Sequence, residues 1–477
     1  MRKLIIVFLL MFFFSLSAIR STLYANNISV SNVTITGQST SASTCKVQFD
    51  ISWENSWRNS VNYDAAWVFI KYSTDSGTTW AHATLKTSGT NPSGFSQGTG
   101  TGLDIVVSTD KKGAFLQRSA NGSGSVSTTS IQFVWDWGAN GLSASSTARV
   151  KVFAIEMVYI PQGAFYAGSG GTGTDEFTST QITTADASAA GGYPTGRTAP
   201  NASWPNGYNA FYLMKYELSQ GAWVDFFNTL TATQKSTRDI TGGVLDSTGK
   251  ASDGTVSRNT VSWTSGDASV GANQYVACNY VSWADLTAFA DWAGLRPMTE
   301  LEFEKACRGT AAAVADEYAW GNTTITQAEG AVQNSGAANE TANTTGVGLC
   351  NYNGAGTDIS SPLRCGFAAT ANTTRVQAGA SYYGVMELSG NLGEKAVTIG
   401  NATGRAFTGT NGDGALDTDG EANVTNWPGT DAVGSGFRGA SWSRAATEVR
   451  ASDRTYAAST SITRNSSGGT RCARTAP

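Results

Sequence analysis

The sequence predicts a multidomain protein: an all-β sandwich, followed by a larger domain in which a few helices lie among long irregular stretches. Three observations support this prediction. Runs of alternating apolar and polar residues, separated by turn-forming Gly, Ser, Asn and Asp, fill residues 26–155. After Glu156 this pattern changes to three short segments with helical signals. The chain of 477 residues is also too long for a single hydrophobic core.

The first 25 residues have the pattern of a secretory leader. A basic start is followed by an apolar run at residues 4–14, and small residues come after it at Ser21 and Ala25. The run is too short to cross a bilayer comfortably, and no later apolar stretch is long enough. We therefore expect a signal peptide at 1–25, with an uncleaved anchor as the alternative, and a secreted, cell-surface or periplasmic protein with no membrane span after leader removal.

Composition narrows the class of partner. Charged residues make up only 14% of the chain, the formal net charge is −4, and short polar residues supply most of the surface polarity. This balance is typical of extracellular proteins rich in strands and loops. It offers no basic patch, so we expect no nucleic-acid partner.

An even number of cysteines in an exported chain favours disulfides. Cys350 and Cys365 bracket one loop rich in Gly, Asn and Ser, and we expect them to pair. Cys472 is expected to reach back to Cys278 or Cys307, while the partner of Cys45 stays open. No C-x-x-C motif occurs, which gives zinc and thioredoxin-type chemistry little support.

The sandwich is predicted at residues 26–155. Its strands include the alternating run 47–53 (VQFDISW), the more continuously apolar run 66–72 (AWVFIKY), and two late runs at 130–135 and 148–155. The last of these continues directly into residues 156–161 (EMVYIP). We therefore place the second domain at 156–477 and expect no flexible linker between the two.

Three helices are predicted in the second domain. The first follows Ser219, and the second is capped by Ser282, with Asp285 three residues on. The third begins at Thr299 with Glu302 in the capping-box position. Long loops lie between and after these helices, and loops of that length need disulfides, ions or dense hydrogen bonding.

Several blocks of this domain, in order, resemble the formylglycine-generating enzyme family, also called the sulfatase-modifying factor (FGE-sulfatase) family. The resemblance implies an α+β domain related to C-type lectins, with little regular secondary structure. We expect most of the Trp, Gly and Arg residues in the blocks to be structural. The blocks are 156–165 (EMVYIPQGAF), 211–219 (FYLMKYELS), 281–283 with 291–309 (VSW; DWAGLRPMTELEFEKACRG), 318–322 (YAWGN), 384–391 (GVMELSGN), 437–442 (FRGASW) and 471–474 (RCAR).

The catalytic cysteines of that family are missing. Active relatives hold copper(I) on two thiolates in the segment after the motif that here ends at Trp442. Residues 439–454 contain no Cys, and the two metal positions fall at or near Arg444 and Val449. Another branch uses iron on three histidines, whereas His82 is the only histidine of this chain. We therefore expect no copper, no catalytic residues and, in all, no enzyme.

A calcium site of the family is expected at residues 387–394 (ELSGNLGE), as a structural ion held by carboxylate and carbonyl oxygens. Two tryptophans usual in this motif are replaced by Gly393 and Lys395. The alternative is a turn whose carboxylates face water. The ligands that the resemblance implies are Glu387, Gly390, Leu392 and Glu394.

The leading functional hypothesis is an exported, non-catalytic bacterial binding protein whose ligand is an unknown protein or glycan at the cell surface or outside. Its contacts would come from the loops after Trp442, where active relatives hold their substrate. A sharper version is that this segment is diversified, as in target proteins of diversity-generating retroelements. Two alternatives remain open: a structural component of a bacterial secretion or surface assembly, and a divergent sulfatase-modifying oxidase. The candidate contacts are Arg444, Thr447, Glu448, Arg454, Thr455 and Tyr456.

Overall fold

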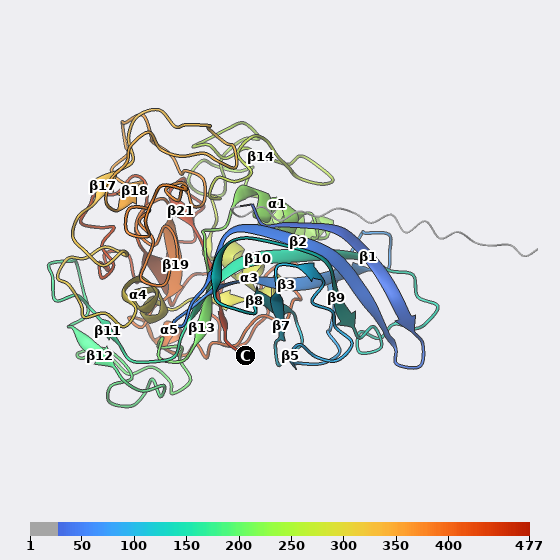
Figure 1. The fold of residues 1–477 in the computed structure, drawn as a ribbon. Coiled ribbons are helices and arrows are strands. Elements are labelled where there is room, and N and C mark those ends of the chain that lie inside the picture. Colours follow the sequence, from blue (N-terminus) through green and yellow to red (C-terminus); the bar gives the residue numbers. More distant parts are fainter. Residues whose placement is uncertain (1–26) are drawn as a thin grey trace, which may run out of the picture.

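The computed structural model describes residues 27–477, so the expected leader at 1–25 lies outside the described residues. Strands predominate and helices are few (Figure 1). The first sheet has the order β1-β2-β9-β6, with β1 at Ser29–Ser39, β2 at Thr44–Arg58, β9 at Gly122–Trp135 and β6 at Thr99–Gly100.

The second sheet is larger and has nine strands. Seven of its strands come from the first 214 residues, one from residues 296–297 and one from residues 472–475. Its order is β16 (Arg296–Pro297), β22 (Cys472–Thr475), β13 (Phe211–Met214), β10 (Arg149–Ile160), β3 (Asp64–Ser73), β8 (Ala114–Arg118), β7 (Leu103–Val107) and β5 (Gly89–Thr90), with β4 (Ala81–His82) also paired to β3.

The predicted alternation in β2 corresponds to alternating burial. Val47, Phe49 and Ile51 are buried in one apolar cluster with Val68 and Ile70 of β3, which belongs to the other sheet. The intervening residues of β2 are half-buried. The period-two pattern thus identifies the face of β2 that packs across the core.

Both faces of β3 are buried, which explains its continuous apolar run. Val68 and Ile70 point into the core shared with the first sheet. Trp67 and Phe69, on the opposite face, belong to a second core that includes Trp292 of α3 (Trp283–Trp292). Trp67 Nε1 also donates to the carbonyl of Ala293 at 2.8 Å. The N-terminal strands therefore pack directly against the C-terminal half of the chain.

The expected domain boundary falls inside β10. Residues 149–158 of this strand pair with β3, and residues 157–160 pair with β13. One continuous strand therefore joins the N-terminal strands, blue in Figure 1, to the rest of the molecule.

The three predicted helix starts are confirmed. Ser219 caps α1 (Gln220–Phe227), and α3 begins with the Ser282–Asp285 capping box. Thr299 and Glu302 form the capping box of α4 (Glu300–Arg308). Two further helices, α2 (Ala232–Arg238) and α5 (Ala402–Arg405), were not predicted.

Small sheets and buried ion pairs organise the irregular remainder. Arg296 pairs with Glu302 at 2.6 Å, and Arg438 pairs with Glu304 at 2.8 Å, all inside the protein. These arginines have the structural role expected of them. The small sheets are β11 (Phe165–Ala167) with β12 (Thr180–Ile182), β14 (Val261–Ser262) with β15 (Ser269–Val270), β17 (Thr326–Gln327) with β18 (Leu349–Cys350), and β19 (Gly393–Val397) between β20 (Ser435–Arg438) and β21 (Gly468–Gly469).

The expected disulfides are a wrong prediction. All six cysteines are buried free thiols. Cys350 Sγ donates to the carbonyl of Ser389 at 3.0 Å, whereas Cys365 Sγ donates to that of Glu217 at 3.3 Å. Each thiol has its own backbone acceptor, and Cys472 is likewise unpaired within β22. The loops are held by ion pairs and turn hydrogen bonds instead.

Within residues 27–477, no helix has the length and apolar character needed to cross a membrane.

Candidate functional site

The segment after Trp442 presents a small surface cluster. The Arg444 guanidinium lies 4.6 Å from the centre of the Tyr456 ring and 3.9 Å from Glu448 Oε1. Tyr456 Oη donates to the same oxygen of Glu448 at 2.9 Å. The structure thus brings three of the six expected contact residues together. Arg444 is exposed, and Glu448 and Tyr456 are half-buried.

The other three expected contacts lie differently. Thr447 and Thr455 are exposed on the same segment. Arg454 is only 3% exposed, and its guanidinium is ion-paired with Glu300 at 2.8 Å and also with Asp175. Arg454 therefore anchors the segment from inside, because its charged group does not reach the surface.

Arg444 and Val449, at or near which the resemblance places the family's two metal cysteines, have unlike surroundings. Arg444 is a surface cation, while Val449 is fully buried among apolar side chains. Cys472, the nearest cysteine along the chain, is buried in β22, where its backbone N–H faces Met214 Sδ. Burial raises the pKa of its thiol far above the ordinary value. No thiolate pair can form at these positions.

The expected calcium loop holds a buried charge cluster. Glu387 and Glu394 are both inside the protein, so the alternative of carboxylates facing water does not hold. Arg471 forms an ion pair with Glu394. Glu387 Oε1 accepts the backbone N–H of Gly366 at 2.9 Å, and its Oε2 is buried with no hydrogen-bond partner among residues 27–477.

A third carboxylate completes the cluster. Glu217 Oε1 accepts the N–H of Leu392 at 2.8 Å, and Glu217 Oε2 accepts the side-chain amide of Asn391. Burial, together with the charges of Glu387 and Glu394, raises the pKa of Glu217 well above its ordinary value. Burial also raises the pKa of Glu387 to about 7 and that of Glu394 to about 7, with Arg471 opposing both rises. The cluster therefore holds protons near neutral pH.

Sequence reasoning missed the roles of Glu217 and Arg471. Both lie in blocks that resemble the family, at 211–219 and 471–474, and a charged residue beside an apolar run was the available signal. Arg471 Nη1 also donates to the carbonyl of Met214 at 3.0 Å, so the guanidinium is fixed in place. The positive charge of Arg471 therefore lies against the expected calcium loop, where it pairs with Glu394. In the described part of the chain, no group of three or more His, Cys, Asp or Glu side chains has an arrangement that could hold a metal ion.

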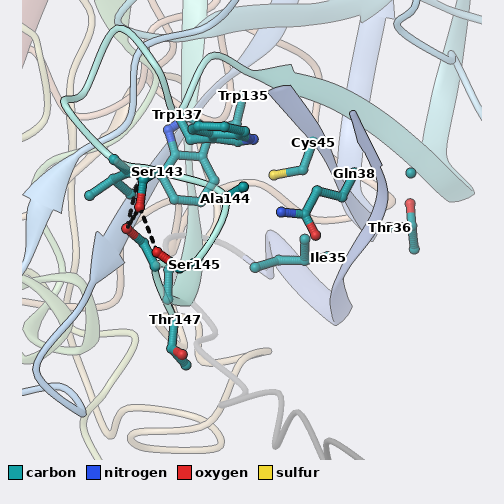
Figure 2. A pocket seen from close by; sticks show the side chains of 14 residues that line it. Ile35, Thr36, Gln38, Cys45, Trp135, Trp137, Ser143, Ala144, Ser145 and Thr147 are labelled. Carbon is teal, nitrogen blue, oxygen red and sulfur yellow. Dashed lines mark hydrogen bonds between the residues drawn. The ribbon is translucent and has the colours of Figure 1, made fainter. Parts of the chain in front are cut away.

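A cavity of about 560 Å³ lies in the N-terminal region, between the end of β1 and residues 142–148. Figure 2 shows the Cys45 sulfur among the residues around this space, with Trp135 and Trp137 on one side and the Ser143 loop below. Burial raises the pKa of the Cys45 thiol to about 12, so it stays a neutral thiol at physiological pH. The cavity has no activated nucleophile.

No curated protein matches the chain. The family model described as "sulfatase-modifying factor enzyme 1-like domain" (FGE-sulfatase) matches residues 144–476. The match begins just before β10 and includes α1, α3, α4 and the small sheets, so it covers well over half of the chain. With this match and the ordered sequence blocks, the chain belongs to the sulfatase-modifying factor enzyme 1-like domain family.

Proposed function

We propose that this protein is an exported, non-catalytic binding protein built on the sulfatase-modifying factor scaffold. The main support for this proposal is that Arg444 at the surface and Val449 in the core lie at or near the positions where the family has its copper ligands. Copper(I) chemistry needs soft thiolates, and neither a guanidinium nor an isopropyl group can supply one. The scaffold is retained without its reactive centre.

The ligand surface in this proposal is the cluster of Arg444, Glu448 and Tyr456, with Thr447 and Thr455 beside it. A guanidinium stacked on an aromatic ring is a fixed, partly exposed donor group, and Arg and Tyr are the residue types most often found at energetic centres of interfaces. Arg454, itself buried, holds the segment from below through its ion pairs with Glu300 and Asp175. In this proposal the ligand is a protein or glycan outside the cell.

The N-terminal strands form a sandwich domain in this proposal, and the C-type-lectin-like part begins within β10. Two sheets that share one apolar core support the sandwich. Because β3 is buried on both of its faces, the sandwich is a rigid extension of the binding domain and not a tethered module.

Arg471, in this proposal, supplies the positive charge that was expected from calcium. Its ion pair with Glu394 and its charge interactions with Glu217 and Glu387 support this, because a guanidinium paired with one of these carboxylates competes with a metal ion. Protons on the carboxylates balance the remaining charge.

The test is a screen of the exported chain against a glycan array and a random peptide display library. We expect a ligand whose affinity falls about tenfold or more in Arg444→Ala, as for a contact at the centre of an interface. Arg149→Ala, an exposed arginine in β10, is the matched control and leaves binding unchanged. Ligands that bind equally well to wild type, Arg444→Ala and Tyr456→Phe would contradict this surface.

A further inference from the structure

A second cleft lies between the N-terminal strands and the family domain. Its volume is about 580 Å³, and it is bordered by the end of β2, the start of β9 and the irregular segment 369–386. None of its lining residues belongs to the surface cluster around Arg444. The residues that carry the inference are Trp57, Asn62, Lys215, Arg375, Tyr382 and Tyr383.

The walls of this cleft are fixed to one another. Asn62 Nδ2 donates to the carbonyl of Tyr383 at 2.7 Å across the two parts of the chain. Gly384 has a φ of +90°, and a Cβ there would lie 2.9 Å from the Trp57 ring, so only glycine fits without a shift. The site is therefore preorganised, and a ligand pays little ordering entropy in the protein.

Aromatic rings are placed at the mouth and wall of the cleft. Tyr382 is 40% exposed, one of the few large apolar side chains at the surface, and it packs edge-on against Tyr383 at 4.9 Å. Trp57 is half-buried, with Lys215 Nζ 5.1 Å from its ring centre. Exposed Trp and Tyr rings pair an apolar face with a polar edge, and the C–H face of a pyranose ring packs on such a surface.

The charge of the cleft favours an anion. No Asp or Glu lines it, and the charge of Lys215 is already compensated by the buried Asp64, 3.1 Å away. The exposed Arg375 donates one N–H to the carbonyl of Ala380 at 2.9 Å, and it forms no ion pair among residues 27–477. Its remaining N–H groups are available for a ligand carboxylate.

An unused polar atom also points to a ligand. Tyr383 is only 2% exposed, and its hydroxyl has no hydrogen-bond partner among the described residues. Buried hydroxyls normally have a partner, so this one indicates a group that the protein itself does not provide.

We propose that this cleft binds an acidic saccharide, with a sugar ring packed on Tyr382, its hydroxyls near Asn62 and Tyr383, and its carboxylate on Arg375. A cationic ligand is disfavoured because Arg375 is the unpaired charge there. This site is separate from the Arg444 surface, so either can exist without the other.

The test is calorimetric titration of the full exported chain with trigalacturonate, and with maltotriose as the neutral comparison. We expect trigalacturonate to bind, and Tyr382→Ala and Arg375→Gln each to weaken binding about tenfold or more. Ile462→Ala and Arg149→Gln, exposed residues of matching type elsewhere, retain wild-type affinity. Circular dichroism verifies that each variant is folded.

Four outcomes would overturn the inference. The first is no binding of trigalacturonate at about 10 mM, a concentration that reveals even a millimolar Kd. The second is unchanged affinity in both cleft variants. The third is maltotriose binding as tightly as trigalacturonate, which would remove the role of Arg375. The fourth is selection of peptides instead of saccharides by the same cleft.

Discussion

Replacing Glu156 with Gln should stabilise the protein at neutral pH. Glu156 in β10 and Asp64 in β3 share one cation, Lys215, at 3.0 and 3.1 Å, and all three are buried. Asp64 also accepts hydrogen bonds from three neutral donors: the Trp53 indole, the Ser56 hydroxyl and the backbone N–H of Trp57. Asp64 therefore has more hydrogen-bond partners than Glu156, whose side chain has Lys215 alone among residues 27–477.

Burial raises the pKa of Glu156 from 4.5 to about 8, with Lys215 opposing the rise and Asp64 adding to it. The folded protein thus keeps a proton that the unfolded chain releases above about pH 4.5. Because the folded state binds more protons, the contribution of Glu156 to the free energy of unfolding is full below pH 4.5 and falls until about pH 8. At pH 7 the free energy of unfolding is therefore lower by roughly 3 kcal/mol than it would be if Glu156 stayed fully protonated in both states.

Glutamine has the shape of the protonated acid and no proton to lose. We therefore expect Glu156→Gln to match the wild type at pH 4 and to be more stable by roughly 3 kcal/mol at pH 7. Lys215→Met should instead destabilise by about 3–5 kcal/mol, because it leaves Asp64 buried without its cation. Urea unfolding followed by tryptophan fluorescence, at several pH values, measures both.

The matched control is Glu329→Gln, which removes an exposed carboxylate. Its difference from the wild type should be small and should not vary in this way with pH. If the difference between Glu156→Gln and the wild type stays constant from pH 4 to pH 8, or if Gln destabilises at pH 7, the assignment of the proton to Glu156 is refuted.

Three further predictions follow from the fold. Trp67→Ala should lower the free energy of unfolding, measured in urea, by about 3–5 kcal/mol because the ring is fully buried between β3 and α3. Trp80 is half-buried, so Trp80→Ala should lower it much less, and equal losses would contradict the shared core. Removal of calcium with EGTA should leave the thermal midpoint unchanged, while Arg471→Gln should lower it; a midpoint raised by added calcium in the wild type would argue for a metal. All six thiols should react with a thiol reagent after unreduced unfolding, and four reactive thiols would reveal a disulfide.

Local features of the fold could be predicted from the sequence. The N-caps at Ser219, Ser282 and Thr299 were readable because a capping side chain bonds within three residues of itself. The alternation of β2 predicted its buried face for the same local reason. The continuous apolar run of β3 was also visible, but its cause, a second layer contributed by α3, depends on residues more than 200 positions away.

Features set by tertiary contacts were not predictable. Spacing suggested that Cys350 and Cys365 should pair, yet each thiol is directed by the backbone carbonyl beside it. Arg454 has the sequence position of a surface residue, but Glu300 and Asp175 hold it inside. At the candidate site, the absence of cysteine was readable from the sequence, whereas the grouping of Arg444 with Tyr456 required the folded segment.

The most direct test of the central claim is copper(I) binding by the purified chain, measured in competition with a chromogenic copper(I) chelator, together with mass spectrometry of a peptide that carries a sulfatase-type cysteine. Non-catalytic binding predicts no stoichiometric copper(I) uptake and no conversion of the peptide cysteine to formylglycine, because residues 439–471 contain no sulfur ligand. Tight binding of one copper(I) per chain, lost in Cys472→Ser and accompanied by formylglycine formation, would contradict it and place the protein among the oxidases.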